Sequence, residues 1–228
     1  MHCTGKNCSK KVFIFSNLQE AELDEIHKII ITKEYKKGQV IFFQGDKADK
    51  LYIIKKGKIK IYKTTKEGKE QILYLLSEGE TIGELSLLKK GEFDFSAEAL
   101  EDVSLCTLTK QDFDNLVINT PGIVLKILEE VHDRLIGLEN LVAQLGTKDV
   151  EVRIANLLVS FINNFGTTIK EGIRLDLPLS REEMGNYIGL TRETVSRKLT
   201  LLQDSGVIEL IGNKVIIIKD LKRLQDNC

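Results

Sequence analysis

The chain has very little histidine and no long apolar run, and both absences narrow its function. It holds three histidines in 228 residues, none of them between residues 33 and 109. A metal enzyme of the cupin type needs histidines and carboxylates clustered in its barrel, so we do not expect an enzyme. No apolar stretch reaches the ~20 residues that cross a bilayer, and residues 1–11 lack the apolar core of a signal peptide. We therefore expect a cytoplasmic protein without membrane contact.

Cysteine and net positive charge are also scarce. Four cysteines are sparse for a disulfide scaffold, and they are Cys3, Cys8, Cys106 and Cys228. The formal net charge is −1, and residues 148–228 hold 12 Lys and Arg against 11 Asp and Glu. Any contact with nucleic acid must therefore come from a local cationic patch rather than from a basic domain.

The sequence pattern predicts a series of short strands over residues 33–109. The alternation in residues 58–62 (KIKIY) predicts a strand with one buried and one wet face. Many short strands with regular turns predict a sandwich or a barrel. A helical spacing of apolar residues over 18–30 precedes them. Glycines recur at turn-like intervals, at Gly38, Gly45, Gly57, Gly68, Gly79, Gly83 and Gly91.

A long helix is predicted next, from Pro121 to Leu145. Its apolar residues are spaced alternately by four and three, which is the heptad stripe that pairs two parallel copies of a helix. Packing of the helix on its own barrel is the alternative, and Ile123, Ile127 and Leu141 widen the apolar face enough for both contacts. The candidate dimer-interface residues are Leu128, Val131, Leu135, Leu138, Val142 and Leu145.

The C-terminal part has the pattern of a winged helix-turn-helix. Ser180 and Glu183 can form a capping box, Gly189 supplies a tight turn, and Thr191 caps a second helix over 192–203. Two β-branched runs follow, residues 207–211 and 214–218, joined by Gly212-Asn213. Glycine first in a two-residue loop predicts a type II′ hairpin, which is the wing.

The second helix of this motif has a polar face suited to reading bases. Val195, Leu199 and Leu202 are spaced to face the domain core. The opposite face offers Arg for guanine, Glu for cytosine, and hydroxyls for base edges or phosphates. A solvated helix surface is the alternative for this segment alone, but the hairpin after it favours double-stranded DNA as the partner. The candidate DNA-binding residues are Arg192, Glu193, Ser196, Arg197, Thr191, Thr200 and Ser180.

These motifs together resemble the CRP/FNR superfamily of bacterial transcription regulators, over nearly the whole chain. The resemblance rests on residues 38–41 (GQVI), 45–46 (GD), 51–54 (LYII), 57–60 (GKIK), 83–85 (GEL) and 177–197 (LPLSREEMGNYIGLTRETVSR). It implies an α+β fold with three parts. They are a cyclic-nucleotide-binding-like β-barrel (jelly roll) with an N-terminal arm over 1–119, a dimerisation helix over 120–146 and a winged helix-turn-helix over 147–228.

The resemblance also implies a homodimer that binds a DNA palindrome and contacts RNA polymerase. Glu193 and Arg197 match both the cyclic-AMP receptor type and the oxygen-sensor type of the family. Ser196 resembles the oxygen-sensor type, whereas Arg192 resembles the cyclic-AMP receptor type. We therefore expect half-sites that contain TGA, either TTGA or TGTGA, read in successive major grooves ~34 Å apart.

The expected effector pocket departs from the cyclic-nucleotide type. In that type a Gly-Glu-Leu segment takes the ribose and an Arg in an Arg-Ser-Ala segment grips the phosphate. Gly83, Glu84 and Leu85 match the first segment, but Phe95 stands before Ser96 where the Arg is expected. A buried phosphate without a cation is costly. We therefore expect Glu84 to be structural and cyclic AMP not to bind.

The cysteines leave three alternatives open. Cys106 matches a barrel cysteine that, in the oxygen-sensor branch, holds a [4Fe-4S] cluster with three arm cysteines, but this arm offers only Cys3 and Cys8. One alternative is such a cluster with a non-cysteine ligand or Cys228. A second is a disulfide between Cys106 and an arm cysteine. The third is plain thiols with another effector, such as haem or a small organic ligand.

One rival function for the whole chain is a cyclic-nucleotide-binding regulatory protein that acts on a protein partner. Such a subunit has no need of a winged helix-turn-helix. The sequence therefore favours a redox- or effector-controlled transcription regulator.

Overall fold

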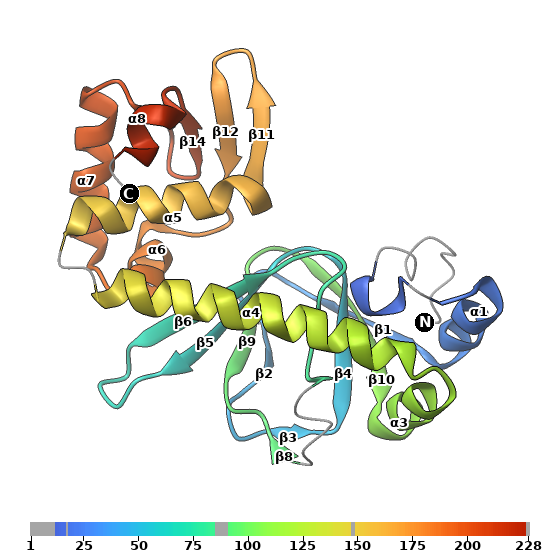
Figure 1. Cartoon of the computed structure of the whole chain (residues 1–228). Coiled ribbons are helices and arrows are strands. Elements are labelled where there is room, and N and C mark those ends of the chain that lie inside the picture. The colour runs from blue at the N-terminus through green and yellow to red at the C-terminus, as the bar shows by residue number, and fades with distance from the viewer. Residues whose placement is uncertain (1–11, 17, 85–90, 147–148, 227–228) are drawn as a thin grey trace. The chain divides into compact units, whose positions relative to one another are not determined.

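The computed structural model describes residues 12–16, 18–84, 91–146 and 149–226. The chain divides into two compact units, Met1–Lys63 with Tyr74–Gly137, and Thr64–Leu73 with Leu138–Cys228. Its mixed helix and strand content is the expected α+β class, and Figure 1 traces the elements in chain order. The domain limits after residues 119 and 146 remain a prediction. Among the residues that the structure describes, every helix is too short or too polar to span a lipid bilayer.

The strands of residues 31–109 form two four-stranded sheets and one two-stranded pair. One sheet has the order β1-β10-β4-β7, the other β2-β9-β5-β6, and β3 pairs with β8. The strands are β1 (Ile31–Tyr35), β2 (Val40–Phe42), β3 (Lys47–Ala48), β4 (Lys50–Lys56), β5 (Ile59–Thr64), β6 (Glu70–Leu76), β7 (Thr81–Ile82), β8 (Gly91–Glu92), β9 (Ser96–Ala99) and β10 (Val103–Thr109). This is the predicted barrel of short strands.

Strand β4 is buried on both faces, and this separates two cores. Tyr52 and Ile54 belong to the core inside the barrel, which also holds Phe93. Leu51 and Ile53 point to the other side of the sheet, because side chains alternate along a strand. They contribute to a second core between the sheet and a layer of helices.

The helical layer consists of α1 (Glu20–Ile29), α3 (Lys110–Asn119) and the first part of α4 (Gly122–Gly146). Ile26 of α1, Phe113 of α3 and Ile127 of α4 meet in the second core. Figure 1 shows α1 and α3 near the start of α4. The expected contact of the long helix with its own barrel is thus present, with Ile123 and Ile127 buried. Helix α3 was not predicted from the sequence.

The prediction of a wet face for the KIKIY strand is wrong at Lys60. This residue is 4% exposed, and its Nζ lies 3.3 Å from the Glu98 carboxylate. Glu98 stands directly opposite on β9. A lysine can occupy a buried strand position when a cross-strand carboxylate neutralises it, which no alternation of residue types reveals.

The second unit holds the C-terminal helices and a four-stranded sheet of order β11-β12-β14-β13. The sequence predicted only the second of its two hairpins. The elements are α5 (Val150–Phe165), β11 (Gly166–Ile169), β12 (Gly172–Asp176), α6 (Arg181–Ile188), α7 (Arg192–Asp204), β13 (Ile208–Ile211), β14 (Val215–Ile218) and α8 (Leu221–Gln225). Ile154, Leu158, Val195 and Leu199 are fully buried in it.

Candidate DNA-binding surface and effector site

Helices α6 and α7 form the predicted helix-turn-helix. The Ser180 hydroxyl accepts a hydrogen bond from the Glu183 amide at 3.2 Å, and the Glu183 carboxylate accepts one from the Ser180 amide at 2.7 Å. Gly189 ends α6 in the left-handed region with φ 68°. The Thr191 hydroxyl then accepts from the Thr194 amide at 3.2 Å and begins α7. Ser180 and Thr191 are therefore both caps that set the two helix starts.

Gly185 is a further determinant of the turn, one that sequence reasoning did not single out. A Cβ atom at this position would lie 2.4 Å from the carbonyl oxygen of Leu190. The chain after the turn therefore passes directly over α6, and the Leu190 amide donates to the Gly185 carbonyl at 2.9 Å. Any larger residue would push the two helices apart.

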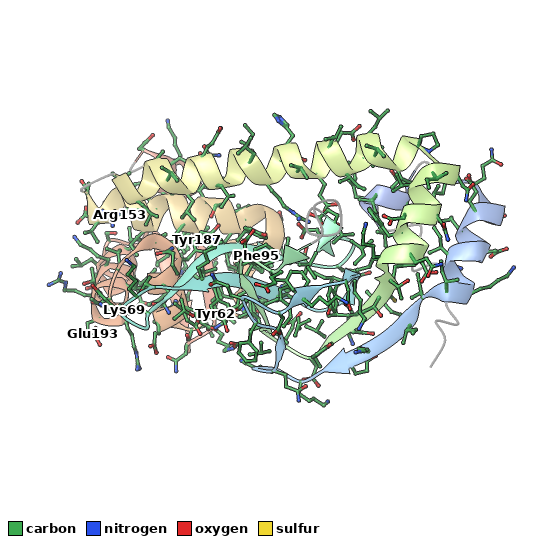
Figure 2. The ribbon with its side chains drawn as sticks, turned by 90° about the horizontal axis from the view of Figure 1, so that it is seen from below. Tyr62, Lys69, Phe95, Arg153, Tyr187 and Glu193 are labelled. Carbon is green, nitrogen blue, oxygen red and sulfur yellow. The ribbon has the colours of Figure 1, made fainter. Side chains whose placement is uncertain are left out.

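The predicted division of α7 into two faces is present. Val195 and Leu199 are buried, and Leu202 is partly buried. All six predicted base- or phosphate-contacting positions on this segment are exposed: Thr191, Arg192, Glu193, Ser196, Arg197 and Thr200. Figure 2 shows Glu193 at the outer edge of the ribbon.

The cations of α7 are not equivalent. Lys198 forms an ion pair with Glu151 of α5, so it ties α7 to the domain. Within the described part of the chain, Arg192 and Arg197 form no ion pair. Their guanidinium groups therefore stand exposed without an internal counter-charge, which suits them to phosphates or guanine edges.

The wing is present, but its turn differs from the prediction. Ile211 of β13 pairs with Val215 of β14, so the loop holds three residues instead of two. The two-residue type II′ turn is therefore wrong, although Gly212 does adopt a positive φ of 59°. The register is set by cross-strand pairing of Ile208, Leu210, Ile216 and Ile218, which the turn sequence alone does not specify.

The described residues Gly83, Phe95 and Ser96 of the expected effector pocket are closely packed in the barrel unit. Gly83 has φ 99°, and a Cβ there would lie 2.7 Å from the Lys50 carbonyl oxygen. The Ser96 hydroxyl accepts a hydrogen bond from the Gln44 amide at 2.9 Å. Phe95 packs edge-on against Tyr74, with ring centroids 6.2 Å apart. Leu85 lies outside the described residues.

Glu84 is buried and held by a side chain of α4. Its Oε1 accepts a hydrogen bond of 2.5 Å from Nη1 of Arg134. Nη2 of the same guanidinium donates to the Thr81 carbonyl and to Glu130, four residues earlier on α4. We call Thr81, Glu84, Glu130 and Arg134 the Arg134 cluster. Sequence reasoning missed Glu130 and Arg134, whose only signal is their helical spacing of four.

Burial dominates the electrostatics of the Arg134 cluster. It raises the pKa of Glu84, although the Arg134 guanidinium acts in the opposite direction. It also raises the pKa of the neighbouring Glu80. Tyr74, whose ring centroid lies 5.8 Å from Cζ of Arg134, has its pKa raised to about 12, mainly by burial. These raised pKa values indicate that an unpaired charge in this region costs free energy.

Cys106 lies in the core on the helical side of its sheet, not inside the barrel. It is 2% exposed, and its Sγ is 3.9 Å from Oγ1 of Thr32 on the neighbouring strand. Val12 belongs to the same core. Cys3 and Cys8 lie outside the described residues. Among the residues that are described, no group of three or more His, Cys, Asp or Glu could hold a metal ion.

The predicted dimer stripe on α4 is exposed in part. Leu128 is 58% exposed, Leu135 52% and Val142 68%. Val131, Leu138 and Leu145 are partly buried, and Val131 packs on the helical-side core. The three exposed residues follow one another at intervals of seven, so they share one face of the helix.

The chain matches two family models. The model of the cyclic nucleotide-binding domain covers residues 32–120, and that of the Crp-like helix-turn-helix domain covers residues 152–226. The match to the first model describes the fold of the barrel. This chain still has Phe95 at the position where the cyclic-nucleotide type has its phosphate-binding Arg.

Two curated relatives align along almost the entire chain. Electron transport regulator A of Shewanella oneidensis is 32% identical over 96% of this chain and 87% of its own length. The fumarate and nitrate reduction regulatory protein of Escherichia coli is 30% identical over 95% and 86%. Among solved structures, FixK2 from Bradyrhizobium japonicum is 25% identical with a TM-score of 0.78, over 87% of this chain and 96% of FixK2.

Proposed function

The chain belongs to the CRP/FNR family of transcription regulators, and we infer its function from this membership. It is a transcription regulator of this type with a helix-turn-helix domain. We propose that it acts as a cytoplasmic homodimer that binds a DNA palindrome and contacts RNA polymerase, and that it catalyses no reaction. The observation that carries the proposal is the exposed polar face of α7, opposite buried Val195 and Leu199.

Recognition of DNA is assigned to specific residues of this face. Arg197 and Arg192 would grip guanine edges, and Glu193 would accept from the amino group of cytosine. Ser196 and Thr200 would contact bases or phosphates, while Ser180 and Thr191 present helix N-termini to the backbone. The Thr200 hydroxyl already donates to the Ser196 carbonyl at 3.1 Å, so it approaches DNA as an acceptor.

A duplex with two inverted TGA-containing half-sites tests this directly. We expect tight binding when the half-site centres are one helical turn apart, ~34 Å. Insertion of about five base pairs turns one half-site to the opposite side of the duplex, so affinity should fall toward the non-specific level, roughly a thousandfold or more. Fluorescence anisotropy at fixed salt measures both duplexes.

Comparing TTGA with TGTGA half-sites in the same assay identifies the preferred outer base. Equal affinity for the spaced and the interrupted palindromes would contradict a dimer that reads two grooves at once.

For control of the regulator we propose a thiol switch at Cys106. Cys8 precedes Val12 by four residues, a span of at most about 14 Å, and Val12 lies in the same core as Cys106. An iron–sulfur cluster fits less well, because Cys3, Cys8 and Cys106 offer three thiolates where four are usual. The histidines do not favour haem, since His132 is exposed and His27 lies on α1. Cyclic AMP is not proposed, because Glu84 is bound to Arg134 and Phe95 offers no cation.

Exposure to oxidised glutathione tests the switch. Cys106 is buried, so an arm thiolate attacks the glutathione disulfide first, forming a mixed disulfide and releasing one glutathione thiol. The Cys106 thiolate then displaces the second glutathione thiol and leaves a disulfide between Cys106 and the arm. Peptide mapping by mass spectrometry should find Cys106 joined to Cys3 or Cys8, with loss of two hydrogens and no glutathione on the two joined residues.

The matched variant Cys106→Ser lacks the second thiol of this bond, so peptide mapping should find glutathione on the arm or a disulfide between Cys3 and Cys8, and no bond from residue 106. Protein prepared without oxygen should be colourless. A broad visible band that bleaches in air, or a sharp Soret band, would contradict the switch and indicate a cluster or haem respectively.

A further inference from the structure

A single guanidinium bridges two buried carboxylates in the barrel unit. The Arg134 side chain is 13% exposed, that of Glu84 2% and that of Glu130 8%. Glu84 follows strand β7, whereas Glu130 and Arg134 lie on α4. The guanidinium therefore holds the helix against the end of β7 through charge-assisted hydrogen bonds to Glu84, Glu130 and the Thr81 carbonyl.

The Arg134 cluster has more acid than base. Besides the guanidinium, only the Thr81 hydroxyl contacts both carboxylates in the described residues, at 3.0 Å from Glu130 Oε2 and 3.4 Å from Glu84 Oε2. Removal of the cation would leave two buried carboxylates without a counter-charge, the costliest way to break such a group. Within the described part of the chain, Nε of Arg134 is buried without a hydrogen-bond partner.

We propose that Glu84, Glu130 and the Thr81 carbonyl form a binding site for a guanidinium-type cation, and that Arg134 is its built-in occupant. The site needs a planar donor, because the two carboxylates and the carbonyl accept from two nitrogens of one guanidinium. The Glu84 carboxylate thereby receives its hydrogen bond from Arg134 of the same chain instead of from a ligand. The barrel and α4 stay joined without an external ligand at this position.

The consequence for regulation rests on the proposed function, because a site filled by Arg134 cannot be used by an external effector. The binding of the Arg134 guanidinium at this site does not depend on DNA binding. Ile123, Ile127, Glu130 and Arg134 follow at intervals of four, three and four, so they lie on one face of α4. Their burial determines which face of α4 remains exposed.

Chemical rescue of Arg134→Ala tests the site. The variant removes the cation and leaves a cavity of guanidinium shape beside Glu84 and Glu130. We expect its thermal midpoint to fall by roughly 6–20 °C, as when one partner of a buried ion pair is removed. Millimolar methylguanidinium should recover at least half of this loss and leave the wild type unchanged. Sodium and tetramethylammonium at the same ionic strength should recover nothing.

Two further variants serve as controls. Lys126→Ala removes an α4 cation whose partner Glu129 is half-exposed, so it should lose little stability and show no rescue. The triple variant Glu84→Gln, Glu130→Gln, Arg134→Met removes all the charges together, and it should fold without responding to methylguanidinium. If Arg134→Ala does not fold alone, its yield on refolding from urea is compared with and without methylguanidinium.

A methylguanidinium effect on Arg134→Ala no larger than that on the wild type, or equal to that on the triple variant, would overturn the proposal. A refolding yield independent of the cation would do the same. Failure of the wild type to bind DNA would instead contradict the proposed function and leave the stability comparison valid.

Discussion

Arg197→Ala is expected to weaken binding to a specific palindrome by about thirtyfold to ten-thousandfold. A guanidinium that grips O6 and N7 of guanine contributes about 1–3 kcal/mol, and a dimer would lose this contact in both half-sites. Arg197 is exposed on α7, and the buried Val195 and Leu199 hold that helix in the domain. Truncation should therefore remove the contact without loss of fold.

The loss should depend on sequence, which distinguishes base reading from general attraction to phosphate. Fluorescence anisotropy with the palindrome and with a scrambled duplex gives the ratio of specific to non-specific affinity. For Arg197→Ala this ratio should fall, and discrimination at one base pair of each half-site should relax. A uniform loss on both duplexes would instead identify Arg197 as a phosphate contact.

Arg174→Ala is the matched control. It removes the same charged side chain from β12, where the guanidinium is paired with Asp176 at 2.8 Å instead of standing on α7. Its specific affinity should stay within a few-fold of the wild type. Unchanged binding by Arg197→Ala would show that the base-reading residues have been assigned incorrectly.

Leu135→Glu is expected to convert the dimer to monomers, with a dissociation constant raised about a thousandfold or more. In a parallel pair the exposed parts of Leu128, Leu135 and Val142 from both copies become buried, which stabilises the pair by roughly 5–9 kcal/mol. A glutamate at the middle position replaces apolar contact with two facing carboxylates that must lose water. Sedimentation velocity over a range of concentrations measures the change.

Asn140→Glu places the same side chain at another exposed position of α4, far around the helix from Leu135. It should leave the association unchanged. Loss of dimer should also lower DNA affinity toward that of one half-site, because each monomer reads one groove. A wild type that stays monomeric at micromolar concentration, or a Leu135→Glu variant that stays dimeric, would refute the assignment of the stripe.

Local chemistry explains why the C-terminal motif was readable from the sequence. The Ser180–Glu183 capping box, the Gly189 turn and the Thr191 cap each act within a few residues, and all three are present. The apolar spacing of α7 likewise identified its buried side. The predicted length of the wing turn was wrong, because this length depends on the register between β13 and β14, and that register is set across the sheet.

The sequence by itself determined the family, the helix-turn-helix and the exposed face of the recognition helix, because caps, turns and helical periodicity are encoded over a few neighbouring positions. Only the tertiary structure decided the environment of residues distant in sequence. Arg134 meets Glu84 across 50 positions, and Lys60 meets Glu98 across a strand pair. Residue type and spacing predict a solvated face for such charges. Burial is favourable only once folding brings the opposite charge within reach, and no local pattern records that partner.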